Sequence, residues 1–205
     1  MSAFLGPIHY WLYNKIKLQE DLVDAVVVLA QEEGITELSD TLAMKYGKFD
    51  RSPLETIIDE GNIHGWLQDK VSRAEYKLAE GVTTLLNKDA NVLGRLEAIF
   101  YEAGEEKASE LLQQEDLSLL VVYKAISDSL LDGMPCDRAV ALVKQEEDEI
   151  VWQTVHCVHE YYWNEVEGNV ENYYKLRAAY LSGFAHALGL KFEVLGERTF
   201  AIKKG

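Results

Sequence analysis

Histidine side chains are the residues of this chain best suited to chemistry, and two of the five lie in a duplicated motif. The stretch G-P-I-H-Y-W-L-Y-N-K-I, residues 6–16, is matched 55 residues later by G-N-I-H-G-W-L-Q-D-K-V, residues 61–71. The shared pattern G-x-I-H-x-W-L-x-x-K places His9 and His64 at equivalent positions. Imidazole is the commonest metal-binding side chain in proteins. The repeat therefore predicts two equivalent metal ligands.

Each repeated histidine falls on the apolar stripe of a predicted helix, because residues 3, 4, 7 and 11 apart share one face. His9 shares its stripe with Glu20, and His64 shares its stripe with Glu75, about 16 Å further along the helix in each case. If the two helices pack with their motifs together, the histidines can share one ligand. If they pack antiparallel, each histidine approaches the glutamate of the other helix. The alternative is a packing role, in which each histidine hydrogen-bonds one neighbour and caps a helix start.

A third cluster lies on a predicted long helix. Trp152, His156, His159 and Trp163 would fall within about 60° of arc on a helix of 3.6 residues per turn. Histidines at i and i+3 can reach one metal ion, and Glu160 borders the same face. The Glu-x-x-His unit typical of metal sites in helix bundles is absent at these positions. The competing interpretation is an aromatic-lined packing face.

Aromatic residues near the C-terminal end also suggest a ligand pocket. Tyr173 and Arg177 share a helix face, where the guanidinium could bind a carboxylate or phosphate. Together with Trp152 and Trp163 they are the predicted binding residues for a planar small molecule. The alternative is that the tyrosines are core residues whose hydroxyls reach a partner or solvent.

Composition excludes several classes of function. The net charge of -15 argues against nucleic acid and against an anionic membrane surface as partners. Two cysteines without paired-ligand spacing indicate a reducing, cytoplasmic location. No signal peptide or membrane-spanning stretch is expected. The motifs of nucleotide-binding proteins, serine hydrolases and zinc proteases are also absent.

Hydrophobic periodicity predicts the elements that would hold these residues in place. Helices are expected over about 7–33 and 61–86, from Pro135 to about Val166, and over roughly 170–188. Alternation with period two predicts a small β-hairpin at about 190–203. The sequence thus predicts an all-α, multi-helix bundle that forms a single domain, 1–205, with a duplicated helical hairpin (6–33 and 61–86) and this C-terminal hairpin.

The functional prediction is a metal-binding helical protein, which could be a metal-dependent hydrolase or oxidoreductase. Its predicted ligands to Zn, Fe, Ni or Mn are His9, His64, His156, His159 and Glu160. One alternative is a binding or sensor module for an aromatic or tetrapyrrole ligand. The other is a homodimeric helical interaction protein whose histidines are structural and whose terminal hairpin pairs with a partner.

Overall fold

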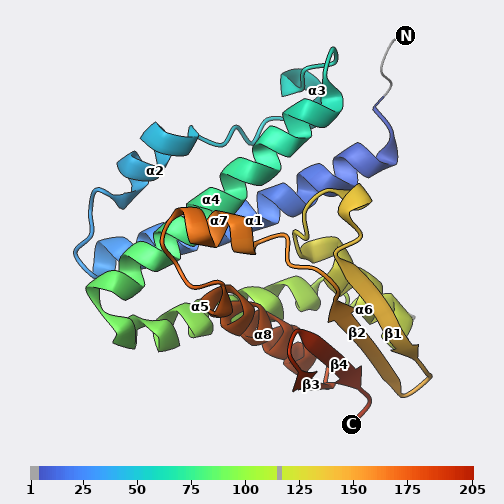
Figure 1. Ribbon diagram of the computed structural model, residues 1–205. Coiled ribbons are helices and arrows are strands. Elements are labelled where there is room, and N and C mark those ends of the chain that lie inside the picture. The colour runs from blue at the N-terminus through green and yellow to red at the C-terminus, as the bar shows by residue number, and fades with distance from the viewer. Residues whose placement is uncertain (1–4, 115–116) are drawn as a thin grey trace. The chain divides into compact units, whose positions relative to one another are not determined.

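The computed structural model describes residues 5–114 and 117–205 and contains both helices and a sheet (Figure 1). Within these ranges there are eight α-helices and one four-stranded antiparallel sheet, so the predicted all-α fold is wrong. The long helix expected from Pro135 to Val166 is replaced by the strands β1 (Val140–Gln145) and β2 (Glu149–Thr154). The segments V-A-L-V-K-Q and E-I-V-W-Q-T are rich in residues that favour strands. The acidic run between them forms the turn of a hairpin.

Two compact units make up the chain, and each is assembled from separate segments. The first contains residues 5–90, Leu130–Asp137 and His159–Gly168. The second contains Asn91–Ser129, Arg138–Val158 and Asn169–Gly205. The single domain expected over 1–205 stays a prediction.

The first unit is helical. Its elements are α1 (Pro7–Glu32), α2 (Leu38–Tyr46), α3 (Leu54–Ile57), α4 (Ile63–Lys88), α7 (Glu160–Glu165) and a 3₁₀ turn (Pro135–Asp137). Proline at the first position of α1 fits a helix start, where its missing N–H is not needed. Gly34, with φ 76°, follows the end of α1 in the left-handed conformation that glycine allows. The side chain of Asn62 caps α4 by accepting the N–H of Gly65.

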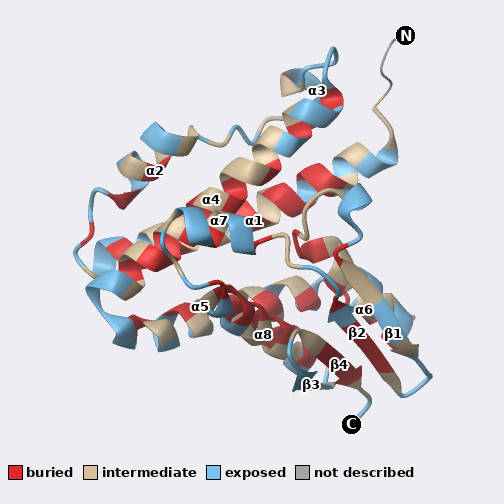
Figure 2. Cartoon of the chain, viewed as in Figure 1, coloured by how far each residue is buried: buried red, intermediate tan, exposed pale blue. Residues whose placement is uncertain are grey.

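The repeated helices α1 and α4 pack side by side and parallel, with their motifs together (Figure 1). The rings of His9 and His64 have centroids 5.8 Å apart, and Glu20 is bound to Lys77 further along both helices. Because both pairs occur in the same order along the two helices, the helices are parallel. Buried residues run as a stripe along each helix (Figure 2). The core between them contains these residues: Leu12, Tyr13, Ile16, Leu54, Ile63, Leu67, Val71, Ala74 and Leu131.

The second unit places the sheet against helices. It contains α5 (Leu93–Ser109), α6 (Leu119–Ser129), α8 (Val170–Ala187), β3 (Lys191–Gly196) and β4 (Thr199–Lys203), besides β1 and β2. The strand order is β1-β2-β4-β3, all antiparallel. The hairpin expected at about 190–203 is present as β3 and β4, and β4 also pairs with β2. A hairpin that is marginal alone thus becomes half of a larger sheet.

The two faces of this sheet carry different side chains. On one face Trp152 lies opposite Phe200, and its ring is 5.4 Å from that of Tyr123 on α6. On the other face Lys203 binds both Glu149 and Glu193. Most residues of the central strands β2 and β4 are buried, whereas the edge strands β1 and β3 are largely exposed.

Helices α5 and α8 approach until their backbones touch. A Cβ atom on Gly104 would lie 2.0 Å from the carbonyl oxygen of Tyr180. A Cβ atom on Gly183 would lie 2.0 Å from the carbonyl oxygen of Tyr101. Only glycine fits at either position, so this pair fixes where the two helices cross.

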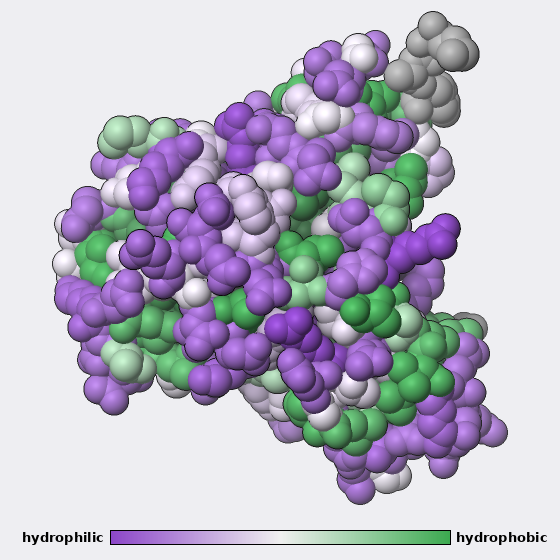
Figure 3. All heavy atoms as spheres, in the orientation of Figure 1, coloured by the Kyte–Doolittle hydropathy of each residue, from purple (hydrophilic) through white to green (hydrophobic). Residues whose placement is uncertain are grey.

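Hydrophilic side chains dominate the visible surface, and apolar side chains gather over β1 and β2 (Figure 3). The exposed apolar residues there include Leu142 and Val143 of β1. In the described part of the chain, no helix is both long and apolar enough to cross a membrane.

Candidate functional site

The duplicated histidines lie next to each other at the start of the parallel helices. Their ring centroids are 5.8 Å apart and their ring planes are tilted by 50°. Of the two packings considered from the sequence, the one in which the motifs meet is observed. His9 is half-buried, and His64 is exposed.

His9 has a defined structural task at the start of α1. Its Nδ1 accepts the backbone N–H of Gly6 at 3.0 Å, which caps the helix. An accepting Nδ1 carries no proton, so Nε2 holds the ring proton in the neutral form. Metal-bound histidines normally donate a hydrogen bond through the second nitrogen. Metal binding through Nε2 would therefore require His9 to release its cap.

The cluster expected on one long helix is not formed on a helix. Trp152 is buried in β2 of the second unit, whereas Trp163 is buried in α7 of the first. Between them, residues 155–159 are not helical, so His156 and His159 do not sit at i and i+3 of a helix. His156 is exposed, His159 is fully buried, and Glu160 is exposed in the first turn of α7.

His159 instead joins two acidic residues inside the first unit. Its Nδ1 lies 3.0 Å from Oε2 of Glu75 on α4, and its Nε2 lies 3.6 Å from Oδ1 of Asp132. Glu75 is 1% exposed and His159 is 0% exposed. Burial by itself would lower the pKa of His159, but Glu75 and Asp132 outweigh it and raise the pKa to about 9. His159 is therefore a buried cation at neutral pH, and Nδ1 donates to Glu75.

This buried trio is not shaped as a metal site. The two ring nitrogens of an imidazole point in different directions, and each of them faces one of the carboxylates. The three side chains therefore do not converge on one point. Over residues 5–114 and 117–205, no group of three or more His, Cys, Asp or Glu side chains is arranged to hold a metal ion.

Tyr173 and Arg177 contact each other within the second unit. Arg177 is 3% exposed, and its Nη1 donates to the hydroxyl of Tyr173 at 3.2 Å. Its guanidinium also lies 5.9 Å from the ring centre of Phe200. The arginine is thus part of the packing between α8 and the sheet.

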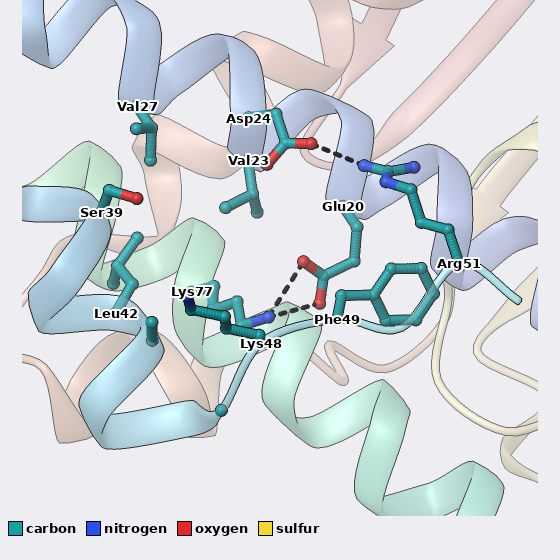
Figure 4. Close-up of a pocket in the computed structure, with 12 residues that line it drawn as sticks. Glu20, Val23, Asp24, Val27, Ser39, Leu42, Lys48, Phe49, Arg51 and Lys77 are labelled. Carbon is teal, nitrogen blue, oxygen red and sulfur yellow. Dashed lines mark hydrogen bonds and ion pairs between the residues drawn. The ribbon is translucent and has the colours of Figure 1, made fainter. Parts of the chain in front are cut away.

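A pocket of about 210 Å³ lies in the first unit, between α1, α2, the 47–51 loop and α4 (Figure 4). At its floor, Nζ of Lys77 donates to both carboxylate oxygens of Glu20, at 2.9 and 3.0 Å. Both side chains are almost fully buried, with 7% and 4% of their area exposed. We call this space the Glu20–Lys77 pocket.

The rim of the Glu20–Lys77 pocket is charged and open to solvent. Lys48 and Arg51 are exposed lining residues, and Arg51 binds Asp24 at 2.6 Å and Asp21 at 2.5 Å. The lining thus carries three cationic and two acidic side chains, although the whole chain is strongly acidic. The remaining wall is mostly apolar and includes these residues: Val23, Val27, Leu42 and Phe49.

Burial has the largest effect on the pKa of Glu20, the carboxyl at the floor of the pocket. It raises the pKa of Glu20, and the hydrogen bond and charge of Lys77 act in the opposite direction. The protonation state of Glu20 therefore depends on how closely Lys77 holds it.

Sequence reasoning missed Lys77, Arg51 and Asp132. A signal existed for Lys77, because it lies three residues after Ala74 and four before Gly81, inside the apolar stripe of α4. A lysine is almost never fully buried unless it is paired. Asp132 and Arg51 lie outside helices and strands, where hydrophobic periodicity gives no signal for a polar contact.

Comparisons with known proteins leave the function to be argued from this geometry. No protein-family model matches the chain, and no curated protein or solved structure is significantly similar to it.

Proposed function

We propose that this protein binds a small polar molecule in the Glu20–Lys77 pocket. The observation that carries the proposal is a buried ion pair at the floor of a solvent-accessible cavity. Burying two charges is unfavourable unless their geometry is good, and an apolar pair would often be as stable. A concave site with a few convergent polar groups and an apolar wall is typical of ligand binding.

The size of the cavity limits the ligand. About 210 Å³ holds roughly seven water molecules at about 30 Å³ each. It is smaller than the pockets of about 300–1,000 Å³ that hold drug-sized molecules. A metabolite of roughly ten non-hydrogen atoms fits this space, whereas the tetrapyrrole considered from the sequence does not.

The proposal is tested by thermal unfolding of the protein against a library of small metabolites. Ligands of this pocket raise the melting temperature of the unchanged chain and fail to raise that of Leu42→Trp, which fills the cavity from α2. Met44→Trp is the matched control, because Met44 is 85% exposed on the same helix. A library in which every hit also stabilises Leu42→Trp contradicts the proposal.

A second candidate function is the metal binding predicted from the sequence, now confined to His9 and His64. Two imidazoles bound to one Zn²⁺ through nitrogens about 2 Å from the metal would have ring centres roughly 5 Å apart. The observed 5.8 Å favours this candidate, and the cap made by His9 opposes it.

Zinc titration of protein purified without a nickel column tests the metal proposal. Binding of one Zn²⁺ that disappears in both His9→Ala and His64→Ala supports it. Binding that survives both substitutions contradicts it. His186→Ala is the control, because His186 lies in α8 of the second unit and is exposed.

A further inference from the structure

We propose that the Glu20–Lys77 pocket binds a small organic carboxylate together with one proton, which Glu20 takes up. This inference rests on the proposed binding function and assigns both the ligand class and a linked proton to that site. The carboxylate of the ligand takes the place of Glu20 beside Lys77, and the protonated Glu20 then donates a hydrogen bond within the pocket.

The floor of the Glu20–Lys77 pocket offers a single cation to an anionic ligand. Lys77 is the one lining cation that is buried, because Lys48 and Arg51 are both exposed. An ammonium has three N–H donors, and two of them already serve Glu20. An anion that reaches the floor therefore has one strong donor to meet, and that donor already holds a carboxylate.

A bound carboxylate would give the floor of the pocket an excess of negative charge. A ligand carboxylate beside Glu20 would place two negative groups against one ammonium in a largely desolvated site. Two carboxylates that share such a site cannot both stay ionised, so one of them is protonated. Burial already raises the pKa of Glu20, and losing part of the interaction with Lys77 raises it further. The proton comes from solvent, and no bond other than the O–H bond of Glu20 is formed.

The rim of the pocket adds one further cation, Lys48. Lys48 is exposed at the entrance, whereas the charge of Arg51 is more than offset by its ion pairs with Asp21 and Asp24. Asp24 is 69% exposed, so solvent screens its charge more than it screens the buried charges of Lys77 and Glu20. The walls of Val23 and Leu42 suit a short aliphatic chain attached to the carboxylate.

Isothermal titration calorimetry of the full chain with succinate, butyrate and succinamide tests this inference. Each titration is run at pH 7 in two buffers that differ in ionisation enthalpy, which reports protons taken up on binding. We expect succinate or butyrate to bind with an uptake of about one proton and the neutral succinamide to bind at least tenfold more weakly. We also expect Kd for the anion to rise by about tenfold for each unit of pH above 7, since one proton is bound with it.

Two variants separate the roles of the floor residues. Glu20→Gln should bind the same anion more tightly, without proton uptake and without dependence on pH. Glu20→Gln combined with Lys77→Met should lose anion binding, and it leaves no buried charge of this pair unpaired. The matched control is Glu80→Gln, because Glu80 lies on α4, binds Lys45 and Tyr46 and does not line the pocket.

The outcomes distinguish this inference from the proposed function. Anion binding without proton uptake, or unchanged pH dependence in Glu20→Gln, overturns the inference and leaves the binding function standing. Tighter binding of succinamide than of the anions also overturns the inference and leaves the binding function standing. If no compound of either charge binds, and no metabolite stabilises the chain through the cavity, the proposed function fails as well.

Discussion

The buried contact between His159 and its two acidic neighbours predicts how stability depends on pH. His159 has a pKa of about 9 in the folded chain, against the ordinary histidine value of about 6.5 in the unfolded chain. A raised pKa means that the folded state holds the proton more tightly than the unfolded state does. The stabilisation is therefore fully present below pH 6.5 and is lost as the pH rises through 9. The difference between the two pKa values corresponds to about 3 kcal/mol, of which about 2 kcal/mol remains at pH 7.4.

Replacing His159 by glutamine should lower the free energy of unfolding at pH 6 by more than the stabilisation that its raised pKa provides. Glu75 would then be a buried carboxylate without its cation, and removing one partner of a buried pair costs about 3–5 kcal/mol. The double variant Glu75→Gln, His159→Gln removes both charges and should be more stable than His159→Gln alone.

Urea denaturation at pH values from 6 to 10, followed by tryptophan fluorescence, measures both effects. Three of the four tryptophans, Trp11, Trp66 and Trp163, lie in the same unit as His159. The free energy of unfolding of the unchanged chain, minus that of the double variant, should fall by about 3 kcal/mol between pH 6 and 9. His64→Gln, at an exposed histidine, should leave the slope unchanged. A difference that is flat or rises with pH would refute the assignment of a charged, buried His159.

Three further predictions concern stability and are measured by urea denaturation at pH 7. Gly104→Ala should lower the free energy of unfolding by at least about 2 kcal/mol, because the new Cβ would lie 2.0 Å from a carbonyl oxygen of the facing helix. Gly94 is on the same helix, and a Cβ atom added there would meet no atom within 4 Å. Gly94→Ala should therefore raise the free energy of unfolding by up to about 1 kcal/mol. Equal effects at the two glycines would contradict the close contact at Gly104. His9→Ala should lower the free energy of unfolding by about 1 kcal/mol, because the helix cap is lost. His64→Ala should change it by less than about 0.5 kcal/mol. A larger loss for His64→Ala than for His9→Ala would contradict the capping role of His9. Arg51→Ala should change stability by less than about 1 kcal/mol despite its two ion pairs, because its side chain is 45% exposed, and a loss above 2 kcal/mol would show that the 47–51 loop depends on it.

The repeated helices could be found from the sequence, but their packing could not. The motif around His9 and His64 marked two equivalent helices, and both are present as α1 and α4. Whether the histidines would meet depended on the segment between the helices. Residues 33–62 contain α2 and α3 and return the chain to the end of α1 at which it began, which allows parallel packing. Periodicity within each helix carries no information on that return path.

The sheet was missed because two periodic patterns overlap in one segment. Trp152, His156, His159 and Trp163 are spaced as on a helix, but β-branched residues and an acidic turn precede them. Strand pairing stabilises the segment around Trp152 as a strand rather than a helix, because β2 lies between β1 and β4 and both neighbours contribute hydrogen bonds. The pairing of β2 with β4 joins residues about 50 positions apart, which local patterns do not reveal.

The candidate site was only partly predictable for the same reason. Glu20, Glu75 and His159 could each be selected as a polar residue among apolar neighbours. Their partners could not, because Lys77 is 57 residues from Glu20 and His159 is 84 residues from Glu75. The two repeats also diverge here, since the position equivalent to Lys77 in the first repeat is Leu22. Equivalent glutamates therefore have different cations.

The separation of Glu75 from His159 along the chain has a consequence for protein synthesis. At about 5–20 residues per second, His159 follows Glu75 into a growing chain after about 4–17 s. During that interval α1 and α4 can pair through their apolar stripes, but the carboxylate of Glu75 has no cation to accompany it into the core. In the nascent first unit that side chain therefore stays in water or takes up a proton, and its ion pair waits for the segment that begins at residue 159. A ribosome stalled shortly after residue 90 would hold an open helix pair, whereas one stalled well beyond residue 168 would hold a closed first unit.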